Sequence, residues 1–416
     1  MTLGERSGAT GVLTAVKGGR IRIGNTNALA RLRLGHQTYR EYTTEGVIRA
    51  TNWILETWLD HLVLGSGYSP NSGIGVGTLV LDADDQVSAT NVYVGGHVAD
   101  PGYGYLTLND GGGLRLGTSP GERANLLGVG YHGGGSGVGS VGRMTITGGV
   151  FRAWLRNLYV GYTEGYGGAN GVLKFGPTNE VIADTIIVGR GHGGGGGRGF
   201  GWLQAVSNGV VNIGSTNCPA ELYIGWQVGD QYCTGTVDAT SWTLNASLNQ
   251  LVVGHNTHPS QGMGNGILGL DASDTMNVST LRLATASTRT RAWVTLYGAR
   301  VGVSNVVDIG QQGTVTNHVQ RYPAGLDFAG SSFTLNGKYH IVFQPPRYQC
   351  VYWGLRWAGS HTNTLQALHD TGKLTWDVSL LSPEHQVLVG IKYDADRDFT
   401  YVGFKHAARG TILSVL

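Results

Sequence analysis

VFRAWLRNLYVG, residues 150–161, decides the fold because its pattern returns along the chain at a nearly constant distance. Its closest copies are NWILETWLDHLVLG (52–65) and SWTLNASLNQLVVG (241–254), and each ends in an L-x-V-G motif: two apolar residues, one residue apart, then glycine. The final residues of the eight copies, the last one degenerate, are Gly65, Gly95, Gly130, Gly161, Gly189, Gly225, Gly254 and Ala284. Their intervals of 30, 35, 31, 28, 36, 29 and 30 residues show a repeat of about thirty residues.

A second strand-like motif, G-x-L-x-L, lies near the middle of each repeat. It occurs as GTLVLD (77–82), GYLTLN (104–109), GRMTIT (142–147), GVLKFG (171–176) and GILGLD (266–271), with no helical periodicity between the motifs. Short strands at a constant period predict an all-β fold, a parallel β-helix (β-solenoid) whose stacked coils share one core. Residues 12–318 would form roughly ten coils, a rod on the order of 50 Å long at ~4.8 Å per coil.

Strand geometry assigns the faces of the L-x-V-G motif. Successive side chains alternate, so its first and third residues point inward and the middle one points outward. Glycine then permits a turn with positive φ. We therefore expect Leu158 and Ile186, which occupy the same position in successive repeats, to lie on top of one another.

Composition narrows the function. The chain has 416 residues, of which 70 are glycine and only 13% are charged, with a net charge of +2 and scattered Lys and Arg. This balance argues against collagen, which needs a G-X-Y period, and against a nucleic-acid partner, which needs a basic surface.

The sequence contains no run of 18 apolar residues that would predict a transmembrane helix, and residues 1–11 lack the apolar core of a secretion signal. Cys218 and Cys233 could form one disulfide or remain two buried thiols, and Cys350 would be left over.

The repeats resemble the autotransporter-associated β-strand repeats of bacterial surface and secreted proteins. The likeness rests on the L-x-V-G strand, the glycine-rich loop and the G-x-L-x-L strand over about residues 50–290, and more faintly on IRIG (21–24) and LRLG (32–35). The resemblance implies a right-handed parallel β-helix in an extracellular or cell-surface setting. It implies no catalytic residue and no cofactor.

Two segments depart from the repeat pattern. GHGGGGGRGF (191–200) lacks the spacing and lysine of a phosphate-binding loop, and it occupies the position that holds loops in other repeats, so we expect a loop.

From residue 319 the chain becomes more charged, with one expected helix over 363–370, ended by Gly372, and two alternating strands. We therefore divide the chain into a solenoid (1–318) and a mainly-β cap or assembly module (319–416), whose last residues, Ile412, Leu413, Val415 and Leu416, read as a possible assembly strand.

No catalytic or metal constellation stands out. A polygalacturonase-like site would place an Asp pair one coil before a Gly-His-Gly, but the Asp84–Asp85 pair lies about three coils before Gly191-His192-Gly193. The turns LDADD (81–85) and LDASD (270–274) could supply calcium ligands, but capping of backbone amides by Asp is the simpler interpretation. The thirteen histidines, His61, His132, His192 and His255 among them, have no carboxylate or cysteine at metal-ligand spacing in the sequence, and we expect most of them in solvated loops. We expect neither an enzyme nor a cofactor.

The aromatic residues form the most specific candidate site. Directly after the L-x-V-G glycine come Tyr131, Tyr162, Arg190, Trp226 and His255, which stacking would align as a surface ladder that contacts a glycan or another subunit, or that only stabilises the stack. The outward strand position carries Tyr93, Tyr159 and Tyr223. The resulting hypothesis is a non-catalytic extracellular fibre or adhesin subunit that self-associates through its ends. The alternatives are a carbohydrate-binding or polysaccharide-cleaving β-helix, or a spacer for the C-terminal module.

Overall fold

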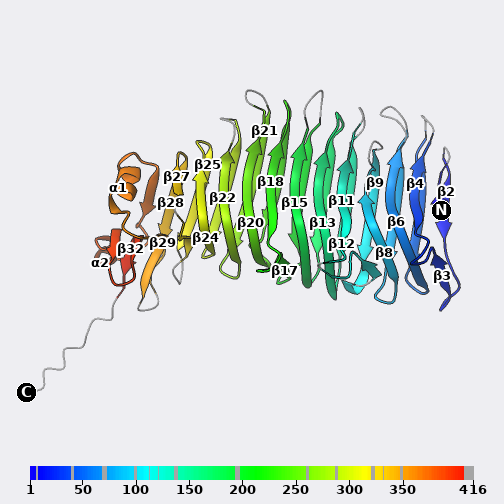
Figure 1. Cartoon of the computed structure of the whole chain (residues 1–416), viewed down its shortest axis with the longest axis horizontal. Coiled ribbons are helices and arrows are strands. Elements are labelled where there is room, and N and C mark those ends of the chain that lie inside the picture. The colour runs from blue at the N-terminus through cyan, green and yellow to red at the C-terminus, as the bar shows by residue number, and fades with distance from the viewer. Residues whose placement is uncertain are drawn as a thin grey trace, which may run out of the picture.

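The computed structural model describes residues 1–5, 8–38, 42–67, 73–97, 101–111, 113–119, 121–134, 139–192, 197–258, 262–285, 289–319, 324–330, 332–346 and 350–406. The protein is nearly all β, with 67% strand and 4% helix. Its strands stack in register as the parallel coils of a β-solenoid of about 11 turns, arranged along the long axis in Figure 1. The predicted fold class is confirmed.

Two long sheets make up the solenoid, and we name them sheet A and sheet B. Sheet A contains β1 (Thr2–Leu3), β3 (Arg20–Ile23), β4 (Ala30–Gln37), β6 (Ile54–Gly67), β8 (Gln86–Val94), β10 (Gly113–Arg115), β11 (Ala124–His132), β13 (Val150–Thr163), β15 (Thr178–Gly191), β17 (Val210–Ile213), β18 (Ala220–Gln227), β20 (Thr243–Asn256), β22 (Thr275–Thr285), β24 (Arg300–Ile309), β26 (Gly325–Phe328), β27 (Ser332–Leu335), β29 (Val351–Ala358), β31 (Gly390–Asp394) and β32 (Phe399–Lys405). Sheet B contains β2 (Thr10–Leu13), β5 (Thr44–Ala50), β7 (Gly75–Leu81), β9 (Gly102–Leu108), β12 (Ser140–Ile146), β14 (Ala169–Phe175), β16 (Gly199–Ala205), β19 (Tyr232–Asp238), β21 (Met263–Asp271), β23 (Arg291–Tyr297), β25 (Gly313–Val319), β28 (Lys338–Phe343) and β30 (Leu374–Asp377). The L-x-V-G motifs lie in sheet A and the G-x-L-x-L motifs in sheet B.

The face assignment of the L-x-V-G motif is confirmed. Leu158 and Val160 are 1% and 0% exposed and belong to one continuous core, whereas Tyr159 between them points away from it. Leu158 pairs with Leu127 of β11 on one side and with Ile186 of β15 on the other. Residues about thirty positions apart therefore contact each other, and each coil completes the apolar surface of the next.

The motif glycines have a role beyond the turn. In each of eight coils the sheet A glycine, with φ between 63° and 77°, contacts the backbone around a sheet B glycine. The pairs are Gly35–Gly46, Gly65–Gly77, Gly95–Gly104, Gly130–Gly142, Gly161–Gly171, Gly189–Gly201, Gly225–Gly235 and Gly254–Gly266. A Cβ on Gly161 would overlap the carbonyl of Phe200, and one on Gly171 would overlap the amide nitrogen of Gly161. The two sheets thus meet backbone to backbone along a line that we call the glycine seam.

The parallel stacking continues beyond residue 318. β25 pairs in parallel with β28 and β28 with β30, which explains why the solenoid has about one turn more than expected. Its last coil is covered by the antiparallel pair β29–β32, by β31, and by the helices α1 (Thr362–Asp370) and α2 (Pro383–Gln386). The helix expected over 363–370 is α1, and a short 3-10 turn, η1 (Asn109–Gly111), is the remaining helical element of the described residues. The division at residue 318 stays a prediction.

Other expectations concern the cysteines, the membrane and the C-terminal end. Cys218, Cys233 and Cys350 are free thiols, so Cys218 and Cys233 are not bridged. Among the described residues, no helix has the length and apolar character needed to cross a membrane. Ile412, Leu413, Val415 and Leu416, the possible assembly strand, lie outside the described residues.

Candidate functional site: the aromatic ladder and the outer face of sheet B

The five residues that follow the L-x-V-G glycine lie in one column on sheet A. Backbone pairing places Tyr131 beside Tyr162, then Arg190, Trp226 and His255, each one coil further along. The Tyr131 and Tyr162 rings stack with centroids 5.3 Å apart, and the Arg190 guanidinium lies 4.5 Å from the Tyr162 ring and 5.2 Å from the Trp226 ring. His255 meets Trp226 edge to face at 5.8 Å. The structure therefore brings the whole predicted ladder together.

The outward strand aromatics join the same cluster. Tyr159 stacks on Tyr162 at 4.1 Å, and Tyr223 stacks on Trp226 at 4.7 Å. Tyr93 packs edge to face against Tyr131 at 5.4 Å. The positive φ at the motif glycine interrupts the strand alternation, so residues three apart fall on the same side.

Exposure differs from the expected surface ladder. Tyr93, Tyr131 and Tyr162 are 6%, 8% and 4% exposed, because neighbouring rings cover their faces. Burial raises the pKa of Tyr131 and of Tyr162 well above the ordinary tyrosine value, and burial together with Glu221 raises the pKa of Tyr223 to about 12. The description of these three rings as a surface is wrong.

Arg190, Tyr162 and Glu164 form a polar network at the centre of the ladder, while Arg190 Nε and Trp226 Nε1 are buried without a hydrogen-bond partner among the described residues. Arg190 donates to the Tyr162 hydroxyl and forms an ion pair with Glu164 at 3.3 Å, and the Tyr162 hydroxyl donates to Glu164 at 2.5 Å. A ring whose face is already covered by a guanidinium or a second ring has little surface left for a sugar. This geometry favours a ladder that stabilises the stack of coils.

The glycine tract connects β15 to β16. Gly191 ends β15, Gly199 begins β16, and the amide of His192 donates to the carbonyl of Gly197 at 3.1 Å across the base of the connection. Residues 193–196 of the expected loop lie outside the described residues. The histidines His61, His132 and His255 lie within the strands β6, β11 and β20, and His132 is buried at 1% exposure, so the expectation of solvated loops is wrong for these three.

The two Asp-rich turns have the same geometry, and it is the geometry of backbone capping. Asp85 accepts hydrogen bonds from the amides of Leu55 and Asp82, both at 2.7 Å. Asp274 accepts them from the amides of Leu244 and Asp271, both at 2.6 Å. Both carboxylate oxygens of Asp85 and of Asp274 are thus occupied by backbone amides, and the described residues contain no group of three or more His, Cys, Asp or Glu arranged to hold a metal.

Burial of these two carboxyls makes the stability depend on pH. Asp85 and Asp274 are 3% and 4% exposed, and burial raises their pKa to about 6 and about 7. Between about pH 4 and 7 the folded protein therefore binds more protons than the unfolded chain. The free energy of unfolding accordingly falls as pH rises through that window and the two carboxyls lose their protons.

We expect the Asp274→Asn variant to show this directly. Its free energy of unfolding in urea should lie furthest below that of the unmodified protein at about pH 4, and the gap should narrow towards about pH 8, because Asp274 loses its proton over this range whereas the amide does not titrate. Asp84→Asn, at an exposed position of the equivalent turn, is the control. A gap that stays constant across this range would contradict the assignment.

A second aromatic surface, which the sequence analysis missed, lies on the outer face of sheet B. One outward column, one residue per coil, runs through Thr78, Tyr105, Arg143, Val172, Trp202, Thr236, Ile267, Trp293 and Thr314. Tyr105, Ile267 and Trp293 are 37%, 37% and 41% exposed, far more than the ladder tyrosines of sheet A. These residues are the variable positions of the G-x-L-x-L motif, so aligning that motif would have revealed the column.

Several arginines of sheet A form ion pairs, whereas two exposed cations of sheet B form none with a described residue. On sheet A, Arg152 pairs with Glu180 and Arg190 with Glu164, each at 3.3 Å, and Arg300 and Arg356 both pair with Asp327. On β7, β9, β12, β14 and β16 of sheet B, all of whose residues are described, the charged outward side chains are Arg143 and Lys174. Both are exposed, and no described acidic side chain pairs with either.

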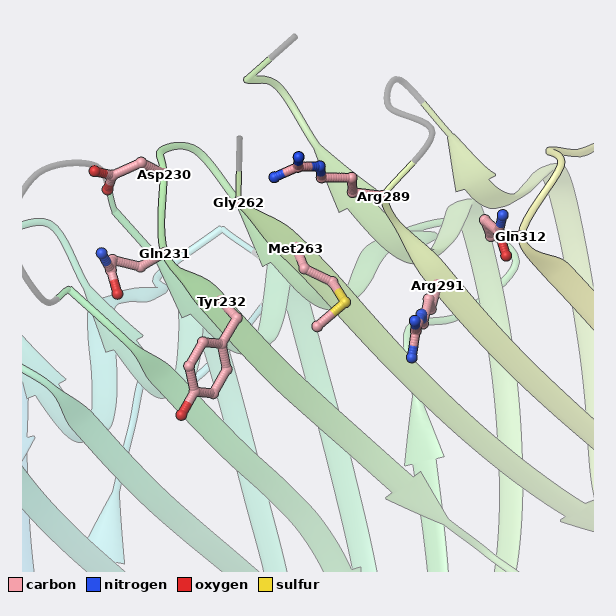
Figure 2. Close-up of a pocket in the computed structure, with 8 residues that line it drawn as sticks. All are labelled: Asp230, Gln231, Tyr232, Gly262, Met263, Arg289, Arg291 and Gln312. Carbon is pink, nitrogen blue, oxygen red and sulfur yellow. The ribbon is translucent and has the colours of Figure 1, made fainter. Parts of the chain in front are cut away.

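An open pocket of about 480 Å³ lies at the starts of β19, β21 and β23, on the edge of this face. Figure 2 shows its lining, which consists of Asp230, Gln231, Tyr232, Gly262, Met263, Arg289, Arg291 and Gln312. Tyr232, Met263 and Arg291 follow one another across the three strands (Figure 2), and the guanidinium of Arg198 lies 4.4 Å from the Tyr232 ring. The aromatic and cationic character of the face therefore extends to this edge.

No protein-family model, curated protein or solved structure matches the chain. The β-solenoid repeat arrangement rests on the structure itself, and the likeness to autotransporter-associated repeats remains a resemblance of pattern.

Proposed function

We propose that this protein is a structural rod that pairs with a second copy of itself through its N-terminal end. The observation that carries the proposal is the open edge of the first coil. β1 pairs with β4, β2 with β5 and β3 with β6, and no described strand covers their other side. Such an edge presents unpaired amides and carbonyls, which favour pairing with another chain.

Side chains at this end are also incompletely covered. Leu3, Leu13, Ile21 and Ile23 pack against the core but remain only half-buried, whereas Leu32, Leu34 and Leu55 of the following coils are fully buried. Val12 is 58% exposed and Val16 81%. Contact with a second copy would remove this apolar surface from water.

The opposite end is closed. There the antiparallel strand β32 lies along β29, Leu365 of α1 is fully buried, and His361 stacks on Trp357 at 3.6 Å. Figure 1 shows the helices and β32 at this end, and β2 and β3 at the other. Solenoids are closed by polar or folded caps, and among the described residues such a cap lies at this end alone.

The geometry of the edge favours a two-fold dimer. A two-fold axis normal to sheet B would join the β2 edges of two copies as antiparallel strands and continue the sheet across the interface. Such an interface closes on itself, and with the other end capped it gives a dimeric rod twice as long. A setting outside the cell, as a fibre or adhesin component, is part of the proposal and is supported by the resemblance of the repeats.

Leu13→Glu is expected to convert the dimer to a monomer, because it places a charge on the half-buried apolar end. Sedimentation equilibrium over a range of concentrations measures the change. Thr14→Glu, which adds the same charge at the exposed neighbouring position, should stay dimeric. A protein shortened after residue 410 should also stay dimeric. Loss of the dimer in the shortened protein alone would instead point to residues 411–416, and a monomeric unmodified protein would contradict the proposal.

Polysaccharide binding is a second candidate function, favoured by the exposed rings of sheet B. Trp293 and Tyr105 present free surface in the same outward column, whereas the ladder rings Tyr131 and Tyr162 do not. Exposed apolar surface gathered on one face of a protein commonly marks a binding site.

A further inference from the structure

We propose that the outer face of sheet B binds an anionic polysaccharide, one chain of which lies along the rod. This inference rests on the second candidate function and is independent of the dimer. It assigns the ligand class and the residues that would hold the ligand: Tyr105, Trp202 and Trp293 for the sugar rings, and Arg143 and Lys174 for the acidic groups.

The spacing of the aromatic residues suits an extended polymer. Tyr105 and Trp202 are three coils apart in the same column, and so are Trp202 and Trp293. At ~4.8 Å per coil, the three rings are spaced at intervals of ~14 Å along a straight line. A polymer of sugar rings lying along the column would contact all three, whereas a small molecule would contact one.

The cations lie between the first two rings. In the column, Arg143 lies one coil after Tyr105, and Val172 of β14 lies one coil after Arg143. Lys174 is on the same strand as Val172, two residues further along the chain. Neither cation forms an ion pair with a described residue. By contrast, acidic partners are present for four arginines of sheet A: Arg152, Arg190, Arg300 and Arg356. An exposed guanidinium and ammonium beside an aromatic ring can bind carboxylate or sulfate groups while the ring stacks on the sugar.

Charge density distinguishes a polysaccharide from a nucleic acid. A nucleic-acid strand carries a phosphate about every 3.4 Å, so one strand of ~28 Å along the column would present about eight negative charges. Over the same length of sheet B, the outward positions of β9, β12, β14, β16, β19, β21 and β23 offer three cations, Arg143, Lys174 and Arg291, beside two carboxylates, Asp238 and Asp271. The observations therefore favour a sparsely charged polysaccharide over a nucleic acid.

The test is affinity electrophoresis of the full chain in gels that contain polygalacturonate, alginate or hyaluronate, with the neutral polymer dextran and an oligothymidine as comparisons. We expect retardation by at least one acidic polysaccharide, and a dissociation constant raised on the order of tenfold by Trp202→Ala and by the double change Arg143→Gln and Lys174→Gln. Arg156→Gln, an exposed arginine of sheet A without an ion pair, is the matched control and should bind normally. Circular dichroism confirms that each variant is folded.

Each other outcome overturns the inference in a recognisable way. Equal retardation by dextran, lost in Trp202→Ala but kept in the double variant, would retain polysaccharide binding and reject the anionic ligand. Stronger binding of oligothymidine would assign a nucleic acid instead. Retardation by none of the polymers would reject both the anionic ligand and the second candidate function, and would leave the dimer untouched.

Discussion

Replacing Gly161 with alanine is expected to lower the free energy of unfolding by about 2–5 kcal/mol. About 1–2 kcal/mol comes from the left-handed backbone, since Gly161 has a φ of 65° that disfavours any Cβ. A further 1–3 kcal/mol or so comes from steric overlap, because the new methyl group would meet the carbonyl of Phe200 across the glycine seam. Urea unfolding followed by circular dichroism measures the loss.

Two other glycines separate these causes. Gly372 also has a positive φ, 70°, but a Cβ there would meet nothing within 4 Å, so Gly372→Ala should cost only about 1–2 kcal/mol. Gly171 lies on the seam without a positive φ, so Gly171→Ala should show the steric cost alone. If Gly161→Ala were no more destabilising than Gly372→Ala, the two sheets would not be in backbone contact.

Leu158→Ala is expected to cost about 3–5 kcal/mol, the range for a fully buried leucine whose cavity cannot collapse. Leu158 is 1% exposed and lies between Leu127 and Ile186 of the neighbouring coils, so its loss removes contacts on both sides. Hydrogen exchange should show the loss of protection centred on β11, β13 and β15, because a solenoid is stabilised by contacts between neighbours.

The control for this prediction is two residues away. Arg156 is an exposed residue of the same strand, and Arg156→Ala should change the free energy of unfolding by less than about 0.5 kcal/mol. Equal effects of the two substitutions would contradict the assignment of Leu158 to the inward face and Arg156 to the outward face of β13.

The fold could be predicted from the sequence because the repeat carries two independent signals. The interval between L-x-V-G motifs gives the stacking of coils, and the alternation within each motif gives the inward face, as Leu158 and Val160 show. The seam could not be predicted, because the interval between the paired glycines varies: Gly161 and Gly171 are ten residues apart, and Gly65 and Gly77 twelve. Only the folded chain shows that they meet.

For the aromatic ladder, the sequence predicted the order of the residues along the coils but not how far their side chains are exposed. Equal positions in successive coils placed Tyr131, Tyr162 and Arg190 in one column correctly. Their burial depends on how side chains of neighbouring coils lean over one another, as Tyr93 does over Tyr131, and no pattern within one repeat encodes it. The exposed column of Tyr105 and Trp293 could have been found by the same alignment, because its positions alternate with buried residues.

Distances between outward positions of sheet B test the stacking of coils most directly. Spin labels at Thr78 and Thr236, which are separated by five coils, or at Thr78 and Thr314, separated by eight, can be measured by pulsed electron resonance after the native cysteines are replaced by serine. Parallel stacking predicts mean separations of ~24 Å and ~38 Å, in proportion to the number of coils. Two separations that do not grow with the number of coils would contradict it.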